Sequence, residues 1–145
     1  MADKDNIEYA NKQIAALNAR DFEGYLSRID ETYVGRTETR PEPIRGVEGV
    51  RQYLQSLFVA FPDLRIEAEQ VISSGDTVVV RMRASGTHRG SYVGIAPTNK
   101  SIVIQACSIT ELRNGKAIQS RMYADNVKLF QQLGALSLPK ATAAG

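Results

Sequence analysis

The hydrophobic residues in the first part of the chain recur at helical spacing and predict three helices. The first spans about residues 7–18, with an apolar stripe that consists of Ile7, Ala10, Ile14 and Leu17. Asp21 can cap a second, shorter helix that ends near Asp30 and buries Phe22, Tyr25, Leu26 and Ile29. The third helix follows Gly46 and ends before Pro62, because proline cannot continue the backbone hydrogen bonding of a helix.

The segment from Tyr33 to Arg45 lies between the second and third predicted helices. It contains Pro41 and Pro43 and shows no regular period. Proline lacks a backbone donor and is confined in sheets to edges and bulges. We therefore expect a short edge strand at Tyr33, followed by a loop.

After Pro62 the pattern changes to the alternation that is typical of strands. It predicts strands over residues 64–72, 77–87, 101–112 and 117–125. The last two are joined at Asn114-Gly115, a strong hairpin signal because both residue types tolerate positive φ. A loop from His88 to Lys100 separates the second strand from the third. A short helical segment over residues 126–133 follows, and residues 137–145 are expected to form a loose tail.

Three helices followed by antiparallel strands predict an α+β domain in which a curved sheet wraps the helical layer. The length of 145 residues suits a single domain, which we place at residues 1–136. The concave face of such a sheet can enclose a pocket. The convex face carries Val79, Val103 or Ile109 and has no helix to cover it, so we expect a homodimer through this face.

The composition excludes several classes of partner and cofactor. Lys and Arg number 18 against 16 Asp and Glu, without a basic block, so nucleic acid is not an expected partner. Apolar runs stay shorter than the roughly 20 residues that span a bilayer, so no membrane is expected and the protein is predicted to be cytoplasmic. One cysteine, one histidine and no regular carboxylate loop predict neither a metal nor a cofactor.

The loop from Gly86 to Lys100 carries a family motif. Its sequence Gly86-Thr87-His88-Arg89-Gly90, followed by Val93 to Lys100, is similar to the G-x-H-x-G and G-x-x-P-T-G-K/R pattern of SnoaL-like ester cyclases. Later matches to the family are Asn114-Gly115-Lys116, Asp125 and Gln131-Gln132-Leu133-Gly134. The sequence thus resembles the SnoaL-like polyketide cyclases, and the resemblance implies a cone-shaped, nuclear transport factor 2-like fold with a curved mixed or antiparallel sheet.

The resemblance also implies a cofactor-independent aldol condensation, in which an aspartate removes a proton next to a carbonyl. Alignment through the same motifs places Met122 at the position of that aspartate. The family's histidine, glutamine and asparagine align with Ser108, Ala106 and Gly35. A thioether cannot accept a proton, so a general base in this chain has to be another titratable group.

Two residues are candidates for that base, and each also has a structural interpretation. Asp125 is a family-matched carboxylate, but it can equally cap the helical segment that follows it. His88 is the one side chain with an ordinary pKa near neutrality, but it can equally hold the glycine-flanked loop by a hydrogen bond. Both interpretations remain open at this point.

The remaining candidates are residues expected to line a substrate pocket, namely Tyr33, Tyr53, Met82, Ala106, Ser108, Ser120, Met122 and Tyr123. If the alignment holds, Ser120 and Met122 face the pocket while Arg121 faces the convex side. The tyrosines can instead be core residues with tethered hydroxyls. Cys107 is interpreted as a small buried hydrophobic residue rather than a nucleophile.

Three functions are compatible with this sequence. One is a proton-transfer enzyme of aldol cyclase or isomerase type, acting on a polyketide-like or other carbonyl compound with His88 or Asp125 as base. Another is a non-catalytic binding module for a small apolar ligand, and the third is a mainly structural dimer. A carboxyl or imidazole directed into the cavity favours catalysis, whereas a neutral apolar pocket favours binding.

Overall fold

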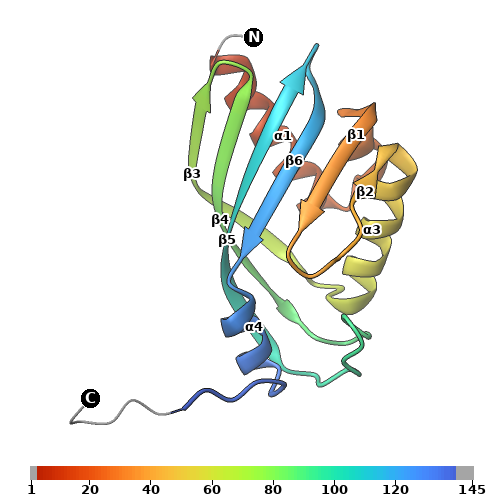
Figure 1. The fold of residues 1–145 in the computed structure, drawn as a ribbon, viewed down its shortest axis with the longest axis vertical. Coiled ribbons are helices and arrows are strands. Elements are labelled where there is room, and N and C mark those ends of the chain that lie inside the picture. Colours follow the sequence, from red (N-terminus) through yellow and green to blue (C-terminus); the bar gives the residue numbers. More distant parts are fainter. Residues whose placement is uncertain (1–2, 140–145) are drawn as a thin grey trace, which may run out of the picture.

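The computed structural model describes residues 3–139, in which one curved six-stranded sheet lies against a layer of helices (Figure 1). The helices are α1 (Asp3–Ala19), α2 (Phe22–Leu26), α3 (Gly46–Ala60) and α4 (Asn126–Gln132). The strands are β1 (Ile29–Thr37), β2 (Ile44–Arg45), β3 (Arg65–Ser74), β4 (Thr77–Thr87), β5 (Ser101–Arg113) and β6 (Lys116–Ala124). The predicted α+β class is confirmed. Of the expected tail, residues 140–145 lie outside the described residues.

The strands follow the order β2-β1-β6-β5-β4-β3, and all neighbours are antiparallel except β1 and β6. In that parallel pair, Thr37 lies beside Met122. The sheet is therefore mixed. The helices α1 and α3 lie on the same side of it, with α3 running alongside β1 and β2 (Figure 1).

Two predictions between the second and third helices were wrong. The second helix ends at Leu26, and Ile29 already belongs to β1, where it is 4% exposed and lies beside Ala117 of β6. Strand β1 is not a short edge strand, because it pairs on both sides and the two-residue β2 forms the edge instead. The prolines Pro41 and Pro43 fall in the loop before β2, as expected.

The buried face of α1 also differs from the predicted apolar stripe. Ile7 is 37% exposed, whereas Asn6 and Gln13 are buried. The Asn6 amide donates hydrogen bonds to Ser73 Oγ and to the Gly75 carbonyl, at 2.8 and 2.7 Å. A buried amide is tolerated when it is hydrogen-bonded, so the phase of the helix is set by polar contacts that hydrophobic spacing does not reveal.

The sheet has one buried face and one exposed face. The apolar side of β4 predicted from alternation is confirmed, since Val78, Val80, Met82 and Ala84 are all buried. The other face bears Val103 and Ile109, which are 36% and 41% exposed. Cys107 lies on this outer face and is only half-buried, so its interpretation as a buried residue was wrong. Within residues 3–139, no helix is long and apolar enough to cross a membrane.

Candidate functional site

An internal cavity of about 70 Å³ lies between the sheet and the helices α2 and α3. Its lining combines three phenols with aliphatic side chains, two further hydroxyls and one arginine. The lining residues are Tyr25, Tyr33, Gly35, Arg36, Thr37, Ile44, Val50, Tyr53, Leu54, Ser120 and Met122. We call this space the inner cavity.

The polar centre of the inner cavity is a pair of hydroxyl groups. Tyr33 Oη lies 2.5 Å from Ser120 Oγ, so strands β1 and β6 are joined by a side-chain hydrogen bond as well as by backbone pairing. Gly35 makes this contact possible, because a Cβ atom at that position would overlap the Tyr33 hydroxyl. Gly35, which aligns with an asparagine of the family, thus leaves room for the phenol of Tyr33.

The tyrosines of the inner cavity are protonated hydrogen-bond donors. Burial raises the pKa of Tyr25, Tyr33 and Tyr53, although the hydrogen bond from Ser120 acts in the opposite direction on Tyr33. Among the described residues that line this cavity, none is a carboxylate or an imidazole. The arrangement is suited to hold a neutral acceptor such as a carbonyl oxygen.

A second space of about 230 Å³, which we call the outer chamber, adjoins the inner cavity at Tyr53. Its lining residues are Thr39, Arg40, Tyr53, Ser56, Leu57, Ser91, Tyr92 and Val93. The hydroxyls of Thr37, in the inner cavity, and Thr39, in the outer chamber, lie 3.0 Å apart. Tyr53 and this threonine pair therefore form the boundary between the two spaces.

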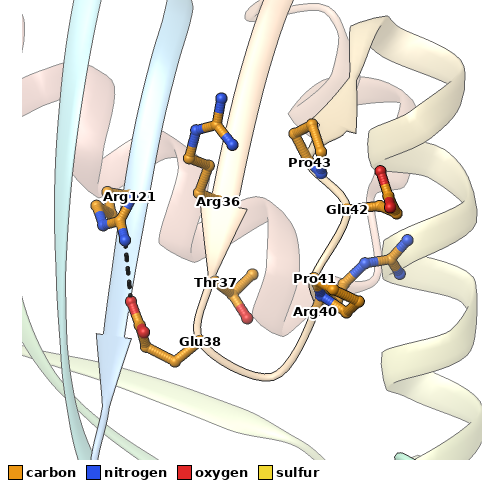
Figure 2. A pocket seen from close by; sticks show the side chains of 8 residues that line it. All are labelled: Arg36, Thr37, Glu38, Arg40, Pro41, Glu42, Pro43 and Arg121. Carbon is orange, nitrogen blue, oxygen red and sulfur yellow. Dashed lines mark hydrogen bonds and ion pairs between the residues drawn. The ribbon is translucent and has the colours of Figure 1, made fainter.

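A third hollow, of about 180 Å³, lies outside the end of β1 (Figure 2). Three arginines, two glutamates and two prolines line it together with Thr37, and we call it the arginine hollow. Arg121 donates to Glu38 there at 3.3 Å, across the gap between β6 and the loop after β1 (Figure 2). Both side chains are close to half exposed, so this ion pair contributes little to stability.

His88 is fully buried in the loop and does not line the inner cavity. Its Nδ1 accepts a hydrogen bond from the Thr98 N–H at 3.2 Å and lies 3.0 Å from Thr98 Oγ1. Nε2 has no partner among the described residues, and the ring packs on Phe61 with centroids 5.5 Å apart. These contacts match the structural interpretation, in which the ring holds the two ends of the loop together.

Asp125 has the capping geometry that the sequence suggested. Its carboxylate accepts a hydrogen bond from the backbone N–H of Lys128 at 3.1 Å, and the residue is the N-cap of α4. The side chain is exposed and is not part of the inner cavity. The structure therefore brings neither His88 nor Asp125 to the inner cavity.

The other predicted pocket residues divide into three groups. Tyr33, Tyr53, Ser120 and Met122 line the inner cavity. Met82, Ala106 and Ser108 lie on the inner side of β4 and β5 but do not border this space. Tyr123 lies on the outer face and is 45% exposed, because alternation directs it away from Met122. Tyr25 also lines the inner cavity but was not predicted from the sequence as a pocket residue. Its position on the buried side of the second predicted helix could have indicated this.

The fold is nuclear transport factor 2-like, and similar solved structures share it. A SnoaL-like polyketide cyclase structure from Jannaschia sp. CCS1 has a TM-score of 0.84 at 21% identity and covers 93% of this chain and 95% of its own. TsrD from Streptomyces laurentii has a TM-score of 0.83 at 25% identity and covers 94% of this chain and 99% of its own. TerC, co-crystallised with polyporic acid, has a TM-score of 0.74 at 20% identity and covers 90% of this chain and 98% of its own.

No curated protein matches the chain. The sequence pattern of the SnoaL-like polyketide cyclase family, in contrast, matches residues 8–133. This range includes every element that builds the inner cavity. The chain therefore belongs to the SnoaL-like polyketide cyclase family.

Proposed function

We propose that this protein binds a small, polyketide-like carbonyl compound in the inner cavity, with the hydroxyls of Tyr33 and Ser120 as hydrogen-bonding partners of a carbonyl oxygen. The observation that carries the proposal is the 2.5 Å hydroxyl pair placed in a cavity that is otherwise mainly apolar and aromatic. Family membership supports the ligand class. The crystal structure of TerC with polyporic acid, a protein of the same fold, supports it as well.

We propose binding rather than proton transfer because none of the described residues that line the inner cavity is a carboxylate or an imidazole. The polar groups that border the inner cavity are phenols, aliphatic hydroxyls and the Arg36 guanidinium. Their ordinary pKa values lie far above neutrality, and burial raises the pKa of the phenols further. Catalysis of the cyclase or isomerase type with His88 or Asp125 as base stays a prediction from the sequence. The same holds for cofactor independence and for a cytoplasmic location.

Replacing Tyr33 by phenylalanine tests the proposed function. The probe is the methyl ether of lawsone, an uncharged naphthoquinone with two ring carbonyls, and the dissociation constant is measured by calorimetry. We expect Tyr33→Phe to weaken binding by about five- to tenfold, since one hydrogen bond to the ligand is lost while the ring remains. Tyr123→Phe is the matched control, because that phenol lies on the outer face and should leave the affinity unchanged.

An unchanged affinity in Tyr33→Phe, or equal losses in both variants, would remove the support for this site. Deuterium uptake by a ketone that falls in Asp125→Asn but not in Tyr33→Phe would instead establish the catalytic alternative.

We also propose that two copies associate through the outer face of the sheet. This face exposes Val103, Ile109 and Tyr123, and no helix of the described residues covers it. Sedimentation at micromolar concentration should show a dimer, and Ile109→Lys should shift it to monomer by placing a charge in the interface. A wild-type monomer, or a dimer insensitive to Ile109→Lys, would show that the outer face is not the interface.

A further inference from the structure

We propose that the outer chamber is a second part of the ligand site, in which Arg40 binds an acidic group of the ligand. The inference rests on the proposed function of the inner cavity and extends it by naming the chemical class that the site selects. The ligand would place its ring carbonyl at Tyr33 and Ser120 and its carboxylate or ionised enol at Arg40.

The first support is the size of the two spaces. Pockets that enclose a small organic ligand measure roughly 300–1,000 Å³, whereas the inner cavity holds about 70 Å³. The outer chamber adds about 230 Å³ directly across Tyr53. A ring compound is larger than the inner cavity alone, so we infer that it extends past Tyr53 into the outer chamber.

The second support is that the boundary between the two spaces is made of groups able to bind a ligand. Tyr53 borders both spaces, so its ring can contact a ligand that spans them. Beside it, the Thr37 and Thr39 hydroxyls lie 3.0 Å apart, with one residue on each side of the boundary. Hydroxyl groups thus extend from the Tyr33–Ser120 pair of the inner cavity into the outer chamber.

The third support is the charge of the outer chamber. Among the described residues that line it, Arg40 is the one charged residue, and its neighbours there include the hydroxyls of Ser56, Ser91 and Tyr92. The Arg40 guanidinium lies over the Tyr53 ring at cation–π distance, with its carbon 5.8 Å from the ring centroid. No carboxylate of the described residues lies within ion-pairing distance of it.

Glu38 and Glu42 are the acidic residues nearest to Arg40 in the chain, and Arg40 also lines the arginine hollow with both of them (Figure 2). Glu38 accepts from Arg121 in the arginine hollow, and Glu42 lines the same hollow (Figure 2). Neither borders the outer chamber. A guanidinium that is held by an aromatic ring and has no ion-pair partner presents planar donors to a ligand, and that geometry suits a carboxylate or an ionised enol.

The test compares one acidic and one neutral probe of the same shape. Lawsone is an anion at neutral pH, and its methyl ether is uncharged. We expect wild-type protein to bind lawsone at least tenfold more tightly than the ether, and Arg40→Gln to lose this preference while its affinity for the ether stays unchanged. Arg40→Lys should retain part of the preference. Arg65→Gln is the matched control, since it removes one exposed positive charge from β3, away from both spaces.

Added salt gives an independent readout. It should weaken the binding of lawsone to wild type but not to Arg40→Gln, because an exposed charge pair is screened. If wild type binds both probes equally, or if Arg40→Gln weakens both to the same extent, Arg40 does not recognise an acid and the inference is overturned. In that case a loss of ether affinity in Tyr33→Phe would leave the proposed function standing. If wild type binds neither probe, both proposals fail.

Discussion

Replacing Gly90 by alanine is expected to destabilise the protein by about 3 kcal/mol, the upper part of the range for forcing extra atoms into a packed region. A Cβ atom at this position would overlap the carbonyl group of Val59, near the end of α3. The overlapped atoms belong to the backbone and cannot rotate away. The N–H groups of Arg89 and Gly90 both donate to the Ala60 carbonyl, at 2.9 and 3.2 Å, so the loop cannot move off the helix without breaking these bonds.

The measurement is thermal unfolding followed by circular dichroism, where a loss of this size lowers Tm by roughly 10 °C for a chain of this length. Gly49→Ala is the matched control. Gly49 lies inside α3, where a Cβ atom would make an ordinary contact with Ile44 at 3.5 Å, and alanine favours helix formation. This control should be neutral or slightly stabilising. A Tm within about 2 °C of wild type in Gly90→Ala would mean that the loop leaves α3 at little cost.

Replacing Met122 by aspartate is expected to have the largest effect on chemistry. The variant places a carboxyl group in the inner cavity, beside the phenols of Tyr33 and Tyr53, at the position where the family resemblance expects an aspartate. Removal from water disfavours the charged form, so the pKa of the new carboxyl should lie well above its ordinary value of about 4. A base of this kind can remove a proton next to a carbonyl that is hydrogen-bonded to Tyr33.

Proton removal is measured as deuterium uptake by the ketone tetralone. We expect Met122→Asp to exceed Met122→Asn by about 10²-fold, the lower end of the usual contribution of a general base. Met122→Leu conserves volume and should not gain activity. Equal rates in the aspartate and asparagine variants would show that position 122 does not reach the ketone.

The stability of the same variant should depend on pH in a defined direction. A carboxyl with a raised pKa binds its proton more tightly in the folded state than in the unfolded state. Stability relative to Met122→Asn should therefore be greatest below pH about 4 and fall as pH rises, until it levels off above the raised pKa. Unfolding by urea at several pH values gives this curve.

Features encoded within a few neighbouring residues could be predicted from the sequence. Asn114 and Gly115 form the expected hairpin turn with φ of 53° and 77°, and Asp125 caps the helix that follows it. The third helix ends before Pro62, as expected. In each case the signal and the structure that it determines lie within one turn of the chain, so local chemistry suffices.

Features that depend on distant residues were missed. The burial of Asn6 is explained by its hydrogen bond to Ser73, which lies on another element and could not be inferred from the spacing of apolar residues. Likewise, Tyr33 and Ser120 are recognisable as pocket residues, but their direct contact requires the parallel pairing of β1 with β6. His88 and Asp125 looked alike as candidate bases because titratable chemistry is visible in a sequence while burial and hydrogen-bond partners are not.

The parallel pairing of β1 with β6 also sets an order of events during synthesis. Strand β1 leaves the ribosome early, and until β6 follows, its one partner in the sheet is the two-residue β2. A two-stranded pair is marginally stable in water, and closing the long loop between β1 and β6 is entropically costly and slow. Strands β3, β4 and β5, by contrast, are consecutive neighbours and can assemble first. Tyr33 therefore meets Ser120 in a late step, and the ligand site exists only once β6 has been made.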